Sequence, residues 1–204
     1  MNAQISPSMQ AIYDTFNLLR KDLSPKLVYH NLWHTTDEVL PGCAQLAQYT
    51  GVSEEDWGLL EVAAAFHDIG FIESYTNHEI VGARIAVQRL PQYGFGDREI
   101  ERVMGMILAT RLPQSPRNLL EEILADADLD VLGRPDFLTR NAALRQEWAN
   151  FGREPPLEQW YEGQLAFLRS HNYFTPAARM LRNERKKKNI TLLEDKLREI
   201  QALA

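Results

Sequence analysis

The stretch AAAFHDIGF, residues 63–71, sets the fold class that the sequence predicts, because it closes an apolar helical segment with a His-Asp pair and a glycine. Neighbouring positions of a helix project about 100° apart, so His67 and Asp68 cannot face one point in a core unless something between them attracts both. A divalent cation meets that condition, since imidazole nitrogen and carboxylate oxygen both bind one at about 2.0 to 2.2 Å. The alternative is a buried histidine satisfied by a nearby carboxylate without a metal.

Helical periodicity extends along the chain on both sides of this stretch. Apolar residues recur at spacings of three and four in nearly every segment, and alternating β-branched runs are missing, so we expect an all-α fold of about nine helices. The tail from Thr175 is expected to form one long helix. Helix starts are predicted at the capping boxes 53–56 and 76–79 and at Ser115-Pro116. Helix ends with left-handed glycines are predicted at Gly51, Gly70 and Gly133.

Composition narrows the class of protein. A chain of 204 residues fits one domain, and we expect a single domain over 1–204, with a core at about 26–135 and C-terminal helices 157–203 packed on it. The 22 basic and 28 acidic residues give a net charge of −6, which argues against nucleic acid or an anionic membrane as the main partner. Cys43 is the only cysteine, the first residues lack a signal-peptide pattern, and the longest apolar stretch is too short to span a bilayer. These features predict a cytoplasmic protein.

Two further segments carry ligand-type residues. In YHNLWHT (29–35), His30 and His34 are four apart and share a helical face, although the Leu-Trp pair between them would also suit an anchor in the core. In ILADADLDVLG (123–133), Asp128 interrupts the apolar stripe of Leu120, Leu124, Val131 and Leu132. Asp126 aligns with a more polar side. Asp128 is therefore the inward-facing candidate, with Asp126 as the alternative.

The order His, His-Asp and distant Asp resembles the HD superfamily of metal-dependent phosphohydrolases, named for its His-Asp pair. The resemblance extends from about Tyr29 to Leu193 and looks like a bacterial subgroup of predicted HD phosphohydrolases. It rests on YHNLWHT, AAAFHDIGF, MILATRL, DADLDVLG, LRQEW and ERKKKNITLL. It implies an all-helical fold and one divalent ion (Mn, Fe, Co, Ni, Zn or Mg) bound by His34, His67, Asp68 and Asp128.

The sequence departs from the two-metal members of that superfamily. His78 stands where the first additional histidine would fall, and Thr110 occupies the place where a further histidine is often found. We therefore expect one ion, with His78 contacting substrate or phosphate. Further candidates are Glu73 or Glu38 for moving a proton, Arg84 and Arg111 for holding phosphate, and His30 with Asn31 at the mouth of the pocket.

These groups predict hydrolysis of a phosphate ester of a small molecule, with a nucleotide as the favoured class, by attack of hydroxide activated by the metal. In this prediction Asp68, Glu73 and His78 are the catalytic residues. Two alternatives stay open: an HD-fold di-iron oxygenase, and a non-catalytic helical regulatory module with a structural metal. His171 has no evident partner and is expected to be structural, and the basic run RNERKKKN (182–189) is expected to be a solvated helix face.

Overall fold

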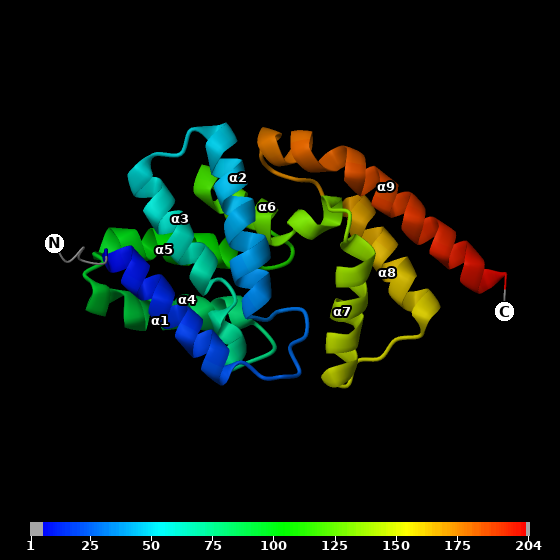
Figure 1. The fold of residues 1–204 in the computed structure, drawn as a ribbon, viewed down its shortest axis with the longest axis horizontal. Coiled ribbons are helices and arrows are strands. Elements are labelled where there is room, and N and C mark those ends of the chain that lie inside the picture. The colour runs from blue at the N-terminus through cyan, green and yellow to red at the C-terminus, as the bar shows by residue number, and fades with distance from the viewer. Residues whose placement is uncertain (1–5, 203–204) are drawn as a thin grey trace. The chain divides into compact units, whose positions relative to one another are not determined.

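The computed structural model describes residues 6–202, which form an assembly of helices (Figure 1). Within that range there are nine α-helices and no strand, so the predicted all-α class is confirmed. The α-helices are α1 (Pro7–Asp22), α2 (Leu40–Thr50), α3 (Glu54–Phe66), α4 (His78–Arg89), α5 (Asp97–Ala109), α6 (Leu119–Asp128), α7 (Phe137–Asn150), α8 (Leu157–Ser170) and α9 (Pro176–Gln201). A π-helix, η1 (His34–Val39), and three 3-10 helices, η2 (Ile69–Ile72), η3 (Leu90–Tyr93) and η4 (Asp130–Gly133), complete the elements.

The chain divides into two compact units. The first holds the described residues up to Pro25 together with His30–Asp128, and the second holds Lys26–Tyr29 and the described residues from Leu129 onward. Most of the expected core at 26–135 therefore lies in the first unit, but that unit ends at Asp128 and also includes α1. The arrangement of both units as a single domain stays a prediction.

Helix α3 is the central element of the first unit. It packs against α1, α2 and α5, and its residues from Val62 to Phe66 are all buried. A helix that is apolar on every side requires neighbours on every side, and the three consecutive alanines, 63–65, let those neighbours approach closely. Full burial of a side chain such as Leu60 or Phe66 contributes about 1.5 to 3 kcal/mol. The His-Asp pair thus follows directly on a buried stretch of helix.

Local capping chemistry explains some helix boundaries as predicted. Ser53 caps α3, accepting a hydrogen bond from the Asp56 N–H at 3.1 Å, and Gly51 ends α2 in the left-handed region with φ of 69°. Thr175 caps α9, so the long C-terminal helix is confirmed. The boundary expected at Ser115-Pro116 is wrong, because α6 begins at Leu119.

The capping box expected at 76–79 is also wrong. Ser74 and Thr76 bond to each other instead, with the Ser74 hydroxyl donating to the Thr76 carbonyl and accepting from its N–H. Helix α4 consequently begins one residue later, at His78, and Asn77 precedes it with a positive φ of 54°. Asparagine tolerates this left-handed conformation better than most residues do. The turn places the His78 ring at the first position of α4.

Two predicted left-handed glycine caps are wrong, because Gly70 and Gly133 lie within 3-10 helices and have no positive φ. Each glycine instead lets a neighbouring helix approach its backbone closely. A Cβ on Gly70 would lie 1.9 Å from the His78 carbonyl oxygen and 2.8 Å from the Gly82 nitrogen. A Cβ on Gly133 would meet Arg182 of α9 at 2.5 Å. Gly70 therefore lets the start of α4 pack directly on η2, next to the His-Asp pair.

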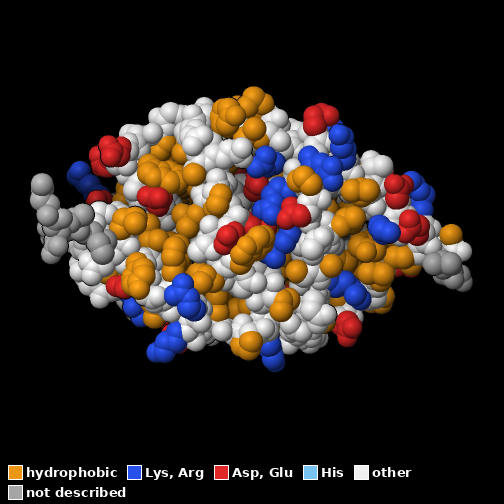
Figure 2. Space-filling model, in the orientation of Figure 1, with side chains coloured by type: hydrophobic (Ala, Val, Ile, Leu, Met, Phe, Trp, Pro, Cys, Tyr) orange, Lys and Arg blue, Asp and Glu red, His pale blue; other side chains and the backbone are white. Residues whose placement is uncertain are grey.

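In the second unit, α9 packs against α8 and η4, and its basic run is only partly solvated. Figure 2 shows Lys and Arg side chains over α9, but Lys186 is buried and bonds to His171, with 3.1 Å between its Nζ and the histidine Nδ1. Burial, followed by the charge of Lys186, lowers the pKa of His171 to about 4. His171 thus has a partner that the sequence did not reveal. No helix among residues 6–202 combines the length and apolarity that crossing a membrane requires.

We predict that Gly70→Ala lowers the free energy of unfolding by more than about 3 kcal/mol, because the added methyl group meets backbone that cannot rotate away. The matched control is Gly58→Ala in α3, where a Cβ would make an ordinary contact of 3.7 Å with Ser8. Urea unfolding followed by circular dichroism measures both. Equal stability of the two variants would contradict the close approach of α4 to η2.

Candidate metal centre

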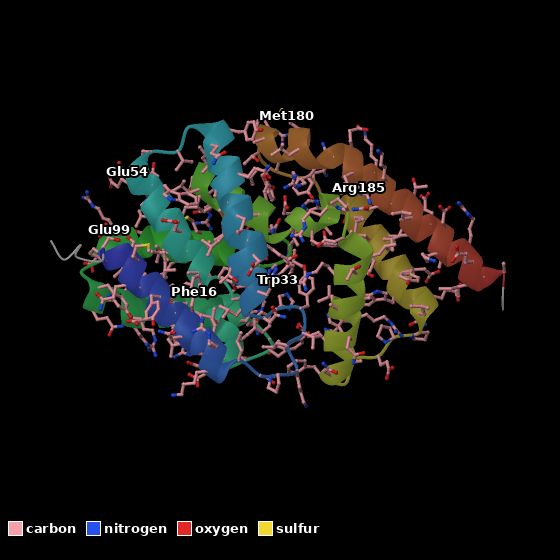
Figure 3. The ribbon with its side chains drawn as sticks, in the orientation of Figure 1. Phe16, Trp33, Glu54, Glu99, Met180 and Arg185 are labelled. Carbon is pink, nitrogen blue, oxygen red and sulfur yellow. The ribbon has the colours of Figure 1, made fainter. Side chains whose placement is uncertain are left out.

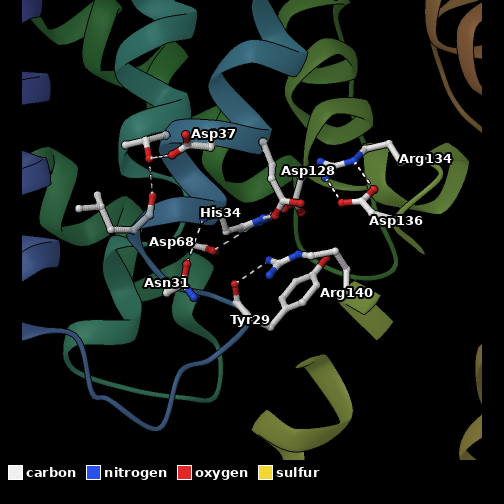
Figure 4. A network of polar contacts seen from close by, with 12 residues as sticks. Tyr29, Asn31, His34, Asp37, Asp68, Asp128, Arg134, Asp136 and Arg140 are labelled. Atoms are coloured by element: carbon white, nitrogen blue, oxygen red, sulfur yellow. Dashed lines mark hydrogen bonds and ion pairs between the residues drawn. The ribbon is translucent and has the colours of Figure 1, made fainter. Parts of the chain in front are cut away.

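His34 is the first residue of the π-helix η1, and two hydrogen bonds fix it. Its backbone N–H donates to Asn31 Oδ1 at 3.2 Å, and its Nδ1 lies 2.9 Å from Glu38 Oε2 (Figure 4). Because a carboxylate only accepts hydrogen bonds, the Nδ1 atom carries the proton. The other ring nitrogen, Nε2, is directed at Asp128, with 3.3 Å between Nε2 and Oδ1. Isolated π-helical turns of this kind occur frequently at functional sites.

His67 and Asp68 face the same point because the helix ends between them. His67 is the C-cap of α3 and its Nδ1 donates to the Ala64 carbonyl at 2.7 Å, so Nε2 is directed away from the helix. Asp68 then leaves the helix with φ of −102° and ψ of 4°, in the sparsely allowed region where many active-site residues lie. The Asp68 Oδ2 atom consequently lies 3.2 Å from His67 Nε2 and 3.9 Å from His34 Nε2.

Asp128, the last residue of α6, completes the cluster. Its Oδ1 lies 3.3 Å from His34 Nε2 and 3.7 Å from His67 Nε2, and its side chain is 18% exposed. Asp126 is fully buried. The structure brings Asp128 to the two histidines, and Asp126 stays the alternative ligand that the sequence offers. Four side chains from η1, α3 with its C-terminal turn, and α6 converge at one place, the His34–His67–Asp68–Asp128 cluster.

The electrostatics of the cluster call for a cation. Within residues 6–202, the ion pairs of Asp68 and Asp128 are to histidines, and no lysine or arginine neutralises either carboxylate. Asp68 is buried, and an uncompensated buried carboxylate is costly. Burial lowers the pKa of His34, but its hydrogen bonds to Asp128 and Glu38 outweigh burial and raise that pKa to about 9. Without a metal, a proton on His34 supplies the missing positive charge.

Two buried atoms of the cluster, His67 Nε2 and Asp68 Oδ2, also have no hydrogen-bond partner among the described residues. Burial raises the pKa of Asp68, but the charge of His67, together with His30 and His78, outweighs it, so the pKa falls well below its ordinary value and the carboxylate is ionised. One donor atom each from His34, His67 and Asp68 lies within 4.8 Å of the others. Two imidazoles with two carboxylates are suitable ligands for a divalent metal, so these residues fit the ion that the sequence implies.

His78 lies on the other side of Asp68, which therefore has a different neighbour at each carboxylate oxygen. The His78 Nε2 atom is 3.4 Å from Asp68 Oδ1, whereas Oδ2 faces His67. The His78 side chain is 19% exposed, more than either clustered histidine, and burial lowers its pKa, so the ring is neutral at pH 7. Phe71 stacks on the ring with the centroids 3.8 Å apart. The neutral His78 is thus held at the solvent side of the cluster.

Three further residues considered in the sequence lie at the rim of the site, on the surface and in the interior. His30 stacks on Phe71 with 4.7 Å between centroids and lies 6.1 Å from the His78 ring, so it belongs to the aromatic rim of the site. Trp33, labelled in Figure 3, is 46% exposed and does not anchor the core. Thr110 is buried and its hydroxyl donates to the Ile107 carbonyl of its own helix.

Glu73 and Arg84, which we predicted separately, form an ion pair with each other on the surface, each about half exposed. No hydrogen bond or ion pair joins either residue to the cluster within residues 6–202. Arg111 donates a hydrogen bond to Asn77 Oδ1 at 3.3 Å, which places it beside the residue that precedes His78. The roles of these three residues in catalysis or substrate binding stay predictions.

The sequence did not predict that two glutamates near the cluster contact histidines of the site. Glu38, considered there only for moving a proton, is bound to His34, and the signal was its position four residues later on the same helical face. Glu79 is buried beside His78, with 3.7 Å between Oε1 and Nε2. Its position next to a histidine at a helix start carried no pattern that distinguishes it from a surface residue.

Comparison with known proteins gives one family and one fold match. Residues 36–130 match the model of the HD domain family, which begins two residues after His34 and includes His67, Asp68 and Asp128. A crystal structure described as a predicted HD superfamily hydrolase, from an uncultured Thermotogales bacterium, shares the fold with a TM-score of 0.63 at 19% identity. The match covers 92% of this chain and 91% of that chain. No curated protein matches the sequence.

We predict that Asp128→Asn weakens Mn²⁺ binding at least about 100-fold, since losing a ligand exceeds the 10–100-fold cost of losing an outer-shell partner. Asp126→Asn removes the same charge two residues away, and it leaves the affinity within about threefold. Isothermal titration calorimetry of the two variants decides which aspartate is the distal ligand. Loss of binding in Asp126→Asn alone would reverse the assignment.

Proposed function

We propose that the chain, whose residues 36–130 match the HD domain family, is a metal-dependent hydrolase that cleaves a phosphate ester of a small molecule. A nucleotide is the favoured substrate class. The observation that carries the proposal is the convergence of His34, His67, Asp68 and Asp128, with buried donor atoms that lack partners. A carboxylate cluster that suits a divalent cation, with a partly exposed neutral histidine beside it, suits an anionic substrate.

A divalent ion held by these four residues would lower the pKa of a coordinated water toward neutrality and offset the charge of a phosphoryl oxygen. The protein's own contribution is to fix the ligands before substrate arrives. His34 and His67 are each bound through Nδ1, so both Nε2 atoms are directed at the centre without rearrangement. Preorganisation of this kind contributes to catalysis, because no energy is spent on orienting the ligands during the reaction.

Asp68 and His78 are the proposed catalytic pair. Asp68 Oδ1 faces His78 Nε2 at 3.4 Å, so this oxygen can accept a hydrogen bond from the His78 ring while Oδ2 remains at the cluster. A neutral imidazole can accept a proton at one ring nitrogen and donate a hydrogen bond from the other, and the His78 side chain is partly exposed. We assign to His78 a hydrogen bond to the substrate phosphate or, as a base, the acceptance of a proton during the reaction.

The proposed phosphate-holding residues lie around His78. Arg111 reaches Asn77, immediately before His78, and Arg84 is on α4 two turns after it. Arg84 is at present paired with Glu73, so a phosphate would have to compete with that carboxylate. Glu73, proposed for proton transfer, would then act only after Arg84 has turned to the substrate. His30, stacked on Phe71, contributes an aromatic edge that suits a substrate ring.

The residue at position 110 disfavours the oxygenase alternative. Position 110 holds a threonine, which has no imidazole to bind a second iron. Its hydroxyl donates a hydrogen bond to the Ile107 carbonyl of α5. A regulatory module with a structural ion is the remaining alternative. In that case the ion would stabilise the fold, but the protein would hydrolyse no substrate.

We predict that the metal-loaded protein hydrolyses phosphate monoesters and that a chelator abolishes the reaction. The test is a panel of nucleoside mono- and triphosphates, p-nitrophenyl phosphate and its bis-ester with Mn²⁺, and Asp68→Ala is expected to lose at least about a thousandfold in kcat/KM. His78→Ala is expected to lose about 100-fold or more, typical of a positioned acid or base.

The matched control for the phosphate-holding role is a second exposed arginine–carboxylate pair, Arg102 with Asp56. Arg84→Ala should raise KM about tenfold, whereas Arg102→Ala should leave KM unchanged. If metal-loaded wild-type protein hydrolyses no ester in the panel while the ion raises its melting temperature, the regulatory-module alternative replaces the hydrolase.

A further inference from the structure

Both histidines of the cluster are held through the same ring nitrogen, but by different acceptors. His67 Nδ1 donates to a neutral backbone carbonyl, that of Ala64, at 2.7 Å. His34 Nδ1 donates to a carboxylate oxygen of Glu38 at 2.9 Å. The side chains of His34 and Glu38 are each 2% exposed, so this hydrogen bond is shielded from water. The two ligands are therefore not equivalent.

The burial of Glu38 requires an explanation beyond chance. Glutamate is among the residues least often buried unless it is paired, and Glu38 pairs with His34 of the cluster. The adjacent acid of the same π-helix, Asp37, is exposed and takes its hydrogen bond from Thr36. Two consecutive acids in η1 thus have different environments, and the buried one contacts the candidate ligand.

We propose that Glu38 is a positioning residue that sets the His34 ring for metal binding, an inference that rests on the metal centre of the proposed function. The carboxylate keeps the proton on Nδ1, which leaves the Nε2 lone pair for the ion, and it fixes the plane of the ring. Its negative charge also makes the imidazole a more basic ligand than a carbonyl acceptor would. Because Glu38 is buried and bonded to His34, it is not the residue that exchanges protons with solvent.

The structure supplies a matched pair of variants for testing this role. Glu38→Gln and Asp37→Asn each remove one negative charge from adjacent positions of η1, but only the first changes the group at His34 Nδ1. Glu38→Gln should weaken Zn²⁺ binding about 10–100-fold, the range seen when an outer-shell partner of a metal ligand is lost. Asp37→Asn should change the affinity by less than about threefold, because an exposed charge is screened by salt.

The dissociation constants are measured by competition with a chelating dye, with Zn²⁺ as the probe and melting curves to confirm folding. Glu38→Asp serves as a second variant: it keeps the charge but is one methylene shorter, so it should also weaken binding even if Glu38→Gln unfolds. In zinc-loaded protein, nitrogen-15 NMR should show the His34 proton on Nδ1, and that proton signal should exchange faster with water in Glu38→Gln.

Equal zinc affinity of Glu38→Gln, Glu38→Asp and Asp37→Asn would overturn the positioning role while leaving the metal centre intact. Failure of the wild-type protein to bind Zn²⁺ or Mn²⁺ would overturn both. Loss of affinity in the Glu38 variants alone supports the positioning role, whichever esters the enzyme hydrolyses.

Discussion

The burial of Asp68 without a permanent positive partner is the constraint on which the candidate site depends. The residue is 5% exposed, and its neighbours are histidines, which carry a positive charge only when protonated. A protein can satisfy such a carboxylate with a proton on an imidazole or with a cation between the two groups. The raised pKa of His34, about 9, shows that the cluster attracts positive charge strongly enough to hold a proton at neutral pH. A divalent ion meets the same demand with a larger charge.

Helix ends position the groups that meet this demand. His34 begins η1, His67 and Asp68 follow α3, Asp128 ends α6 and His78 begins α4. At helix ends the backbone can turn, so side chains from neighbouring positions can face one point, as His67 and Asp68 do through the φ and ψ of Asp68. Gly70 then allows α4 to approach η2 closely enough to place His78 beside Asp68. The apolar interior of α3 and the polar centre are thus consequences of one sequence stretch, residues 63–71.

Periodicity predicted the helical class and the inward-facing Asp128, because both are local properties of a helix. The full set of His34, His67, Asp68 and Asp128 came from the resemblance to the order of residues in the HD superfamily. The sequence also predicted the Ser53 cap and the Gly51 terminus, which depend on one or two residues. Gly70 was misread because glycine has two uses, positive φ and close approach, and the choice depends on helix α4, which begins later in the chain at His78. The start of α4 was misread because Ser74 and Thr76 bond to each other, and the burial of Glu38 depends on tertiary packing that no single-helix pattern encodes.

Counting the metal ions in tag-free protein by inductively coupled plasma mass spectrometry, after reconstitution with Mn²⁺ and removal of free ion, tests the central claim most directly. The account predicts close to one ion per chain, retained in His78→Ala and absent in Asp68→Ala. Two ions per chain, with one lost in His78→Ala, would show that His78 is a ligand and that the site is binuclear. No bound ion in the reconstituted wild-type protein would contradict the claim that a cation satisfies the carboxylates of Asp68 and Asp128.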